Sequence, residues 1–364
     1  MMKYKLCFFA PLMLCVLGGC TQAPPAQSEF VLGTVCTINL YQYGSSRLYG
    51  KLFSRLRELE GIFSANSADS VLAAVNAAAG VEPVPAGEDL VRVLERALYF
   101  AQASGGAFDP SIGPLVKLWG IGTETAGVPA DEAIEKALGL VNWRDIRLDR
   151  EGGTVFLARP GMALDLGAIA KGYAADETVK LIADAGVPLA MIDLGGNIYV
   201  HGEKKGNRPW RIGIQNPLEP RGAYLGVLER QNPAPPRPPR GGGPAAYAGS
   251  RNAADPLANK TVVTSGIYER FFTDAGRNYH HILSAGDGYP AETGLLSVTV
   301  IAENSMDADA LSTAAFALGW ERGAALVKAQ GAEAVFVLAD RRIRCSAGAA
   351  AVFSLSDTSY RLAE

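Results

Sequence analysis

Apolar residues recur at helical spacing in four segments, and each pattern predicts a helix with one buried face. Ser45 can cap the first of these helices, and Gly105-Gly106 and Gly186 can end the second and the third. The segments begin after Ser45-Ser46, after Gly87, at residue 168 and near Asp307. The inward-facing residues of the fourth are Ala308, Leu311, Ala315 and Leu318.

Shorter apolar runs, several of them alternating with polar residues, predict strands. The first run is interrupted at Gly33-Thr34. The predicted strands cover residues 30–40, 189–193, 198–201, 211–215, 224–229, 261–264, 295–302, 334–338, 343–345 and 352–355. Helices and strands mix without a regular β-α-β alternation, which favours an α+β fold with mixed sheets and packed helices. A chain of this size can form two lobes.

The first residues are typical of a targeting segment. Lys3 and Lys5 precede an apolar stretch at 6–17 that is too short to span a bilayer. Residues 17–20 then resemble a bacterial lipobox, which predicts a signal peptide at 1–19, lipidation of Cys20 and a membrane tether at 20–29. An uncleaved anchor or a chance cysteine is the alternative. We therefore expect a bacterial membrane lipoprotein, attached by its lipid only, that faces the periplasm or the cell exterior.

One internal segment lacks apolar periodicity. Residues 231–259 are rich in proline and glycine, and we interpret them as an exposed insertion, disordered or polyproline-like, between the strands at 224–229 and 261–264. A docking site for proline-binding partners is the alternative. The globular part would then extend from residue 30 to residue 364 around this insertion.

Composition excludes several classes of site. The chain has three histidines and five cysteines, too few at tight spacing for a zinc site or an iron–sulfur cluster. The net charge is −3 and no basic run could follow a nucleic-acid backbone, so nucleic-acid binding is disfavoured. Beyond the first twenty residues only Cys36 and Cys345 remain, either paired or buried separately.

A carboxylate and a hydroxyl share one face of the fourth predicted helix. Asp309 and Thr313 are four residues apart, so they lie one turn from each other just after the strand at 295–302. Oxygen ligands of this kind suit a hard cation, and Mg²⁺ fits the composition best.

Glycine-rich segments can bring backbone amides close to an anionic ligand. One is the loop at 104–115, where Phe108 can stack on a planar ring or belong to the core, and Asp109 can cap a turn. Another is Gly195-Gly196 between two strands. Thr264-Ser265 adds hydroxyl groups at the end of a strand.

Two ionisable residues are candidates for charge stabilisation and proton transfer. Lys171 lies early in the third predicted helix, where the helix dipole does not favour a cation, so we expect an anionic partner such as a phosphate. A solvated lysine is the alternative. His281 follows His280 near a strand, where it can serve acid–base chemistry or fill the core.

Taken in chain order, these motifs resemble the ApbE family of flavin transferases from about residue 30 to beyond residue 319. Leu32-Gly33-Thr34, Phe63-Ser64, Ser70 and Asn76 add to the resemblance. The motifs that carry it lie at 104–110, 164–173, 195–197, 264–268, 281–282 and 308–314. The resemblance implies a two-lobed fold with a groove for FAD between the lobes.

The resemblance also implies a reaction. Such enzymes bind FAD as substrate, cleave its diphosphate with Mg²⁺, and attach FMN to a threonine hydroxyl of a target flavoprotein, releasing AMP. Asp309, Thr313 and a backbone oxygen at Ala170 would hold the metal, and Lys171, His281 and Asp309 would be catalytic. The residues implied in FAD binding are Gly33, Asn66, Ser104, Gly105, Gly106, Phe108, Asp109, Lys171, Asp176, Gly195, Gly196, Thr264, Ser265 and His281.

Two departures from the family pattern leave other functions open. Ser284 replaces a carboxylate common after the His-Ile pair, and Asp287 is the nearest acidic residue that could compensate. Asn66 stands where many members have an aromatic residue that would cover the flavin. A more open site favours water as acceptor, so an FAD diphosphatase yielding free FMN and AMP is one alternative. A lipoprotein that binds FAD without chemistry is the other.

Overall fold

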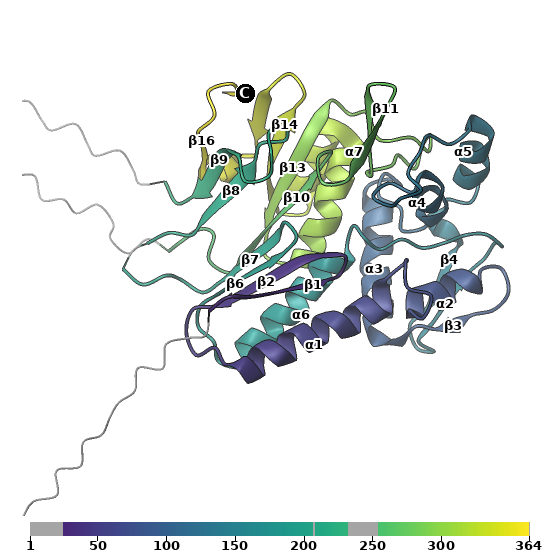
Figure 1. Ribbon diagram of the computed structural model, residues 1–364, viewed down its shortest axis with the longest axis horizontal. Coiled ribbons are helices and arrows are strands. Elements are labelled where there is room, and N and C mark those ends of the chain that lie inside the picture. The colour runs from purple at the N-terminus through teal and green to yellow at the C-terminus, as the bar shows by residue number, and fades with distance from the viewer. Residues whose placement is uncertain (1–24, 207, 232–253, 364) are drawn as a thin grey trace, which may run out of the picture.

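The computed structural model describes residues 25–206, 208–231 and 254–363 (Figure 1). The expected lipidation site Cys20, the signal peptide and the centre of the expected insertion lie outside these residues. Within the described part of the chain, no helix is both long and apolar enough to cross a membrane.

The centre of the fold is a nine-stranded sheet in which neighbouring strands are antiparallel, except for the last pair. The strands, in spatial order, are β1 (Gln27–Val31), β2 (Thr34–Leu40), β6 (Ala190–Leu194), β7 (Asn197–His201), β10 (Lys260–Gly266), β13 (Leu295–Ala302), β14 (Glu333–Leu338), β15 (Arg342–Cys345) and β17 (Arg361–Leu362). The prediction of an α+β fold is confirmed.

The N-terminal hairpin corrects two expectations. The predicted strand at 30–40 is two strands, β1 and β2, joined by Leu32-Gly33, both with positive φ (57° and 68°). Two left-handed residues in succession form the kind of tight turn that matches the twist of a hairpin. Because β1 begins at Gln27, the end of the expected tether at 20–29 belongs to the sheet.

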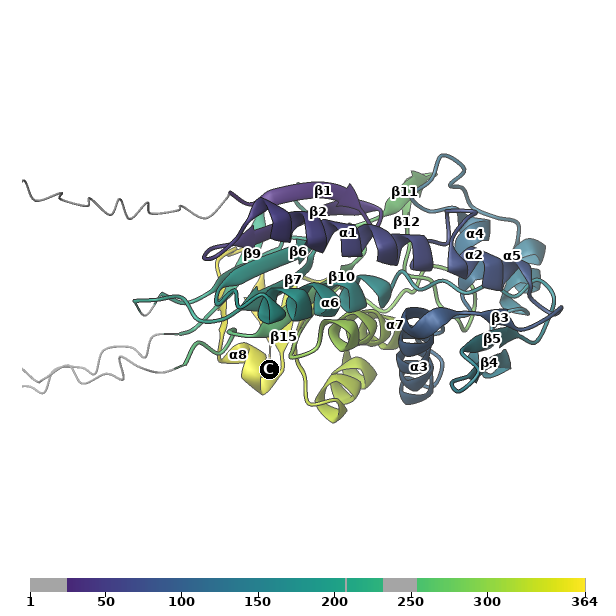
Figure 2. The ribbon, with the colours of Figure 1, turned by 90° about the horizontal axis from the view of Figure 1, so that it is seen from below.

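Three of the four predicted helices cover one face of the sheet, and the helix that begins at Gly87 packs beside them, against the fourth helix and the strands at 146–149 and 154–157 (Figure 2). The four are α1 (Ser46–Phe63), α3 (Gly87–Ala103), α6 (Ala170–Asp184) and α7 (Ser305–Ala329). Ser45 caps α1 by accepting the amide of Leu48 at 3.2 Å, as the sequence predicts. The third helix begins at Ala170 rather than at 168, and α7 is kinked at Gly319, whose φ of 77° and ψ of 178° are not helical.

A smaller sheet covers part of the opposite face. Its strands are β8 (Arg211–Gln215), β9 (Tyr224–Glu229) and β16 (Phe353–Leu355), and the short helix α8 (Ala347–Ala350) lies beside them. Apolar residues of this sheet pack on Val262, Ile301 and Val335 of the large sheet. The central strands are therefore buried on both faces, which explains why β13 is apolar at nearly every position.

A second lobe lies beside the sheet and contains elements that the sequence did not predict. They are α2 (Val71–Ala77), β3 (Val84–Pro85), α4 (Gly113–Trp119), α5 (Asp131–Leu138), a 3₁₀ turn at Trp143–Asp145, β4 (Ile146–Asp149), β5 (Thr154–Leu157), β11 (Phe271–Asp274) and β12 (Arg277–His280). An aromatic stack holds the β11–β12 hairpin to α4, since Tyr279 packs between Phe272 and Trp119 at centroid distances of 5.2 and 5.6 Å.

The expected insertion at 231–259 is shorter than the sequence pattern indicates. Its final residues pack on the protein: the carboxylate of Asp255 accepts the amide of Trp210 at 2.6 Å, and Leu257 is buried. At its other end, the side chain of Gln231 donates to the hydroxyl of Ser354 at 2.6 Å.

The cysteines of the described chain are free. Cys36 lies on β2 and Cys345 on β15, near opposite edges of the large sheet, so they do not pair. Burial raises the pKa of the Cys36 thiol to about 12 and that of Cys345 to about 11.

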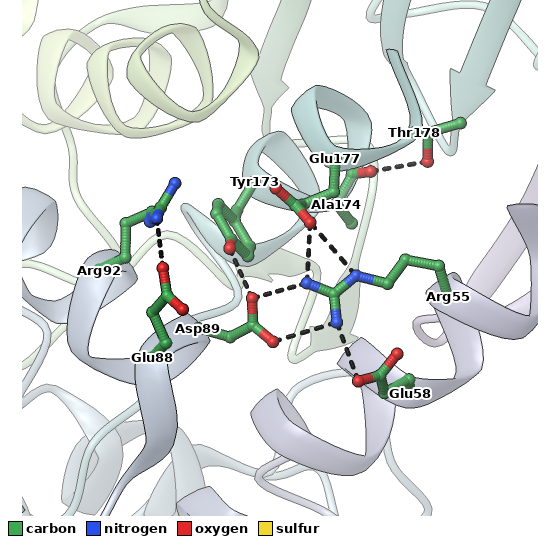
Figure 3. A network of polar contacts seen from close by, with 9 residues as sticks. All are labelled: Arg55, Glu58, Glu88, Asp89, Arg92, Tyr173, Ala174, Glu177 and Thr178. Atoms are coloured by element: carbon green, nitrogen blue, oxygen red, sulfur yellow. Dashed lines mark hydrogen bonds and ion pairs between the residues drawn. The ribbon is translucent and has the colours of Figure 1, made fainter. Parts of the chain in front are cut away.

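A guanidinium ties three helices together (Figure 3). Arg55 of α1 donates to Asp89 of α3 at 2.6 Å and to Glu177 of α6 at 2.8 Å, and it pairs with Glu58 of its own helix. The hydroxyl of Tyr173 donates to the same Asp89 carboxylate at 2.5 Å. The first turns of α6 are therefore fixed against both α1 and α3.

Helices α6 and α7 cross with their backbones in contact at Gly172. A Cβ at this position would lie 2.3 Å from the carbonyl oxygen of Ser305 and 2.6 Å from the Cα of Met306. No side chain fits there, so glycine is required for the crossing. Each helix also caps the other: Asp309 of α7 accepts the amide of Gly172, and Asp176 of α6 accepts the first amides of α7.

Gly172→Ala should therefore destabilise the protein. Because the added methyl group meets backbone atoms rather than a mobile side chain, we expect the free energy of unfolding to fall by about 1–3 kcal/mol or more, as measured by urea denaturation. Gly50→Ala is the matched control, because Gly50 is exposed inside α1 with open space around it. That variant should gain about 0.5–1 kcal/mol. Equal stability of the two variants would contradict the close crossing.

Candidate active site

A cavity of about 700 Å³ opens where the two lobes meet. Its wall combines the tip of the β1–β2 hairpin, the end of α1, the loop before α4, the start of α6, the β6–β7 turn, β10, the base of the β11–β12 hairpin and α7. Segments from all parts of the sequence thus converge on one space, which is the usual setting of a ligand site.

Asp309 and Lys171 face each other across the crossing of α6 and α7. The Oδ2 atom of Asp309 accepts the amide of Gly172 at 2.9 Å, and Oδ1 lies 3.9 Å from Nζ of Lys171. Nζ also donates to the carbonyl of Gly167 at 3.0 Å. Burial raises the pKa of Asp309, while Lys171 and the Gly172 amide act in the opposite direction. The anionic partner expected for Lys171 is, within the protein, this carboxylate.

Thr313 lies one turn after Asp309, as its spacing predicts. Its hydroxyl is 2.9 Å from the hydroxyl of Ser265, which lies 2.8 Å from that of Ser312. Asp309, Thr313 and Ala170 all line the cavity. Lysine, carboxylate and hydroxyl groups therefore meet at one corner of it.

This corner fits a hard cation that completes its coordination with ligands from outside the protein. Among the described residues, no group of three or more His, Cys, Asp or Glu residues could hold a metal. Asp309 offers a carboxylate at this corner, with a hydroxyl from Thr313 and backbone oxygen nearby. Mg²⁺ is commonly held by one or two carboxylates together with substrate phosphates and water, so a sparse oxygen set of this kind suits it.

His281 is held in one orientation at the base of the β11–β12 hairpin. Its Nδ1 lies 3.2 Å from the carbonyl oxygen of Arg270, and its backbone amide donates to the same oxygen at 3.1 Å. A carbonyl oxygen only accepts, so Nδ1 carries the proton and Nε2 keeps a free lone pair. Burial lowers the pKa of His281 to about 3, aided by the positive charges of Arg270 and Lys171, and the ring is therefore neutral near pH 7.

Most of the other residues predicted to bind the cofactor also line the cavity. They are Gly33, Asn66, Phe108, Asp109, Gly195, Gly196, Thr264 and Ser265. Phe108 is 5% exposed and packs edge-on against Phe100, so it serves the core as well. Asp109 caps its own turn by accepting the amide and hydroxyl of Ser111.

Four predicted residues lie elsewhere. Ser104, Gly105 and Gly106 form the turn that ends α3, and the Ser104 hydroxyl accepts the amide of Phe108 at 3.0 Å. The φ angles of Gly105 and Gly106 are 66° and 90°, so these glycines serve the helix end. Asp176 binds the amides of Ser305 and Met306 at 2.8 and 2.9 Å, and its burial raises its pKa to about 6. These bonds fix the start of α7, and Asp176 is not among the residues that line the cavity.

The cavity also contains polar residues that the sequence reasoning missed. They are Glu60, Asn197, Arg221, Glu269 and Arg270. Asn197 is 1% exposed, and its Nδ2 has no hydrogen-bond partner among the described residues. Burial raises the pKa of Glu269. Asn197 is the last residue of the motif at 195–197, although it was not predicted to bind the cofactor, and Glu269 directly follows the motif at 264–268. Arg221 lies in a hairpin turn without any such signal.

Asp287 does not replace the carboxylate that is missing at Ser284. The Ser284 hydroxyl accepts the amides of Gly286 and Asp287 at 3.2 and 3.4 Å, and the carboxylate of Asp287 accepts the amide of Tyr289 at 3.1 Å. Both side chains serve the turn, and neither lines the cavity.

Sequence comparisons identify relatives along most of the chain. A protein from Treponema pallidum (strain Nichols), named FAD:protein FMN transferase, is 40% identical over 359 residues, covering 92% of this chain and 91% of the relative. A protein of the same name from Klebsiella pneumoniae (strain 342) is 34% identical over 336 residues, covering 92% of this chain and 96% of the relative.

Solved structures agree with this relationship. The crystal structure of the ApbE protein from Thermotoga maritima matches with a TM-score of 0.75 and 29% identity, covering 88% of this chain and 96% of that one. The apo form of the Pseudomonas stutzeri flavinyl transferase ApbE matches with a TM-score of 0.68 and 28% identity, covering 86% and 90%. The profile of the ApbE family matches residues 32–336. The chain therefore belongs to the ApbE family.

Proposed function

We propose that the protein transfers FMN from FAD to a threonine hydroxyl of a target flavoprotein, with Mg²⁺ and with release of AMP. Its relatives from Treponema and Klebsiella are named FAD:protein FMN transferases. The observation that carries the proposal is that Asp309, Lys171 and a neutral His281 line one cavity between the lobes. Such a set can bind a diphosphate, offset its charge and accept a proton from an incoming hydroxyl.

Backbone and apolar groups would hold the flavin nucleotide. Gly195 and Gly196 present backbone without side chains, and their φ angles of 67° and 93° are accessible mainly to glycine. A Cβ on Gly195 would lie 2.3 Å from the hydroxyl oxygen of Thr34, so this turn and the β1–β2 hairpin lie in contact. Phe108 offers an apolar surface for the rings. The Nδ2 atom of Asn197 is a donor for a ligand oxygen.

Charged groups of the chain would act on the diphosphate. Mg²⁺, bound by Asp309, Thr313 and the Ala170 carbonyl, would supply positive charge beside the bridging oxygens. Lys171, at the N-terminus of α6, adds a fixed positive charge on the same side. Gly172 orients Asp309 through its amide, so the carboxylate cannot turn away from the cavity.

His281 would take the proton of the acceptor hydroxyl at Nε2, because Nδ1 is engaged with the Arg270 carbonyl. The hydroxyl oxygen then bonds to the FMN phosphorus while the bond from that phosphorus to the bridging oxygen breaks. AMP leaves with that oxygen. Water that reaches this corner would compete with the hydroxyl as acceptor.

A second activity is favoured by one feature of the site. Asn66 is exposed on the cavity wall, where an aromatic side chain would cover more of a bound ligand. With this opening, water can replace the threonine hydroxyl, and the products would be free FMN and AMP. We therefore propose FAD diphosphatase activity as the second candidate.

The N-terminal sequence supports a location outside the cytoplasm. A signal peptide at 1–19 and a lipid on Cys20 would place the protein on a bacterial membrane, facing the periplasm or the cell exterior. The partners there are FAD and a target flavoprotein that carries the acceptor threonine.

Incubation of the protein with FAD and Mg²⁺, with and without a target flavoprotein domain, tests the proposed function. We expect the acceptor to gain the mass of FMN by intact-protein mass spectrometry, with AMP released in equal amount. Free FMN and AMP without acceptor would establish the diphosphatase. Intact FAD in every sample would contradict both activities and leave a binding protein.

Asp309→Asn should weaken divalent metal binding, since it removes the only charge of the oxygen set. We expect at least about tenfold weaker binding of Mn²⁺ by electron paramagnetic resonance, together with loss of transfer. Asp307→Asn is the matched control, because Asp307 on the same helix pairs with Arg96 of α3 and does not line the cavity. Unchanged Mn²⁺ affinity in Asp309→Asn would contradict the metal site.

The pH dependence of transfer should lack the titration of an ordinary histidine. With a pKa lowered to about 3, His281 stays in its neutral, proton-accepting form throughout the range from pH 5.5 to 8. A histidine with a pKa of about 6.5 would lose roughly tenfold in neutral fraction between pH 7.5 and 5.5. We expect kcat/KM for the acceptor to fall by less than about twofold over that interval. An inflection near pH 6.5 that disappears in His281→Gln would contradict the neutral ring.

A further inference from the structure

The outer edge of β1 lies open beside the cavity. Strand β1 is an edge strand of the nine-stranded sheet and, among the described residues, pairs only with β2 (Figure 2). Val31 and Thr34 flank the two-residue turn, so this pair exchanges the ladder hydrogen bonds. Hydrogen-bonded pairs alternate with non-hydrogen-bonded pairs along an antiparallel ladder, so Phe30 and Ser28 belong to non-hydrogen-bonded pairs. Their amides and carbonyls therefore point outward, away from β2.

The same hairpin carries an exposed apolar step. Phe30 and Val35 are directly opposite each other across the β1–β2 pair and are 77% and 58% exposed. Side chains opposite each other in an antiparallel pair lie on one face, so these two form a continuous surface. Both residues line the cavity. The apolar step therefore continues directly into the mouth of the proposed active site.

The tip of the hairpin is held at the cavity rather than swinging free. Leu32 lines the cavity with a φ of 57°, a left-handed conformation that is unfavourable for a bulky residue. Gly195 lies so close to Thr34 that it has no room for a Cβ. A chain bound along β1 is consequently directed into the cavity at a fixed position.

We propose that the outer edge of β1 binds, as an added strand, the segment of the target flavoprotein that carries the acceptor hydroxyl. This inference rests on the proposed transfer function. A hydroxyl from a folded partner must reach a cavity between two lobes, which an extended segment can do. Outward amides at Ser28 and Phe30 would give main-chain hydrogen bonds, and Phe30 with Val35 would contact alternate side chains of the segment. Glu29, the charged residue of this edge, is paired with Arg57 of α1.

Two variants test the edge in the full-length protein with FAD and Mg²⁺. Ser28→Pro removes an outward amide that the β1–β2 ladder does not use, and proline is tolerated at such edge positions. Ser28→Ala is its control, because both variants lose the contact of the Ser28 hydroxyl with Thr37. Phe30→Ser shortens the apolar step without altering the core. Steady-state transfer to a flavoprotein domain that the wild type labels is followed by mass spectrometry, and FAD affinity by flavin fluorescence.

Loss of one main-chain hydrogen bond should lower kcat/KM for the acceptor about fivefold in Ser28→Pro, mainly through KM. Ser28→Ala should stay within about twofold of the wild type, and FAD affinity should be unchanged in both. Phe30→Ser should also raise the KM for the acceptor.

Other results would overturn the proposal in distinguishable ways. Wild-type kcat/KM in both Ser28→Pro and Phe30→Ser, with a wild type that transfers FMN, would refute the edge alone. An equal loss in Ser28→Ala would assign the effect to the hairpin's side chains. A dimer by light scattering that Ser28→Pro converts to monomer, with transfer unchanged, would make this edge a contact between copies. A wild type that labels no acceptor would refute the transfer function and this inference with it.

Discussion

The crossing of α6 and α7 at Gly172 is the contact on which the rest of the site depends. Without a side chain at this position, the two backbones touch, and Asp309 can reach the amide of Gly172. Asp176 completes the arrangement from the other side by binding the first amides of α7. Each carboxylate faces the N-terminus of a helix, where the helix dipole favours negative charge. The crossing thus joins two helices distant in sequence and sets the separation of Lys171 and Asp309.

In this arrangement the carboxylate of Asp309 is fixed in position, but its negative charge is only partly balanced by neighbouring groups. Asp309 is 4% exposed, receives one backbone hydrogen bond, and has its nearest cation 3.9 Å away. A buried charge with so few partners is costly, and a bound cation would relieve that cost. The network around Arg55 keeps α6 from shifting to accommodate the charge by itself. Stability and ligand binding are therefore coupled at this corner.

The sequence predicted those parts of the molecule whose pattern is local. The stripe of α1 and its cap at Ser45 could be identified because one face is buried and the other is solvated. The four-residue spacing of Asp309 and Thr313 was enough to place them together. The elements of the second lobe were missed because short segments such as α4 are stabilised by aromatic contacts with the distant Tyr279. Asp176 was assigned to the ligand by resemblance, whereas its partners lie about 130 residues away on α7.

The two separate cysteines of the described chain have a practical consequence. The thiolate is the form that reacts with maleimides and related reagents, and the raised pKa values of Cys36 and Cys345 keep both side chains protonated at neutral pH. A cysteine introduced at an exposed position of this domain would have an ordinary thiol and would react first. Fluorophores or spin labels could then be placed beside the cavity without replacing either native residue, so that ligand binding at the cavity can be followed directly in solution.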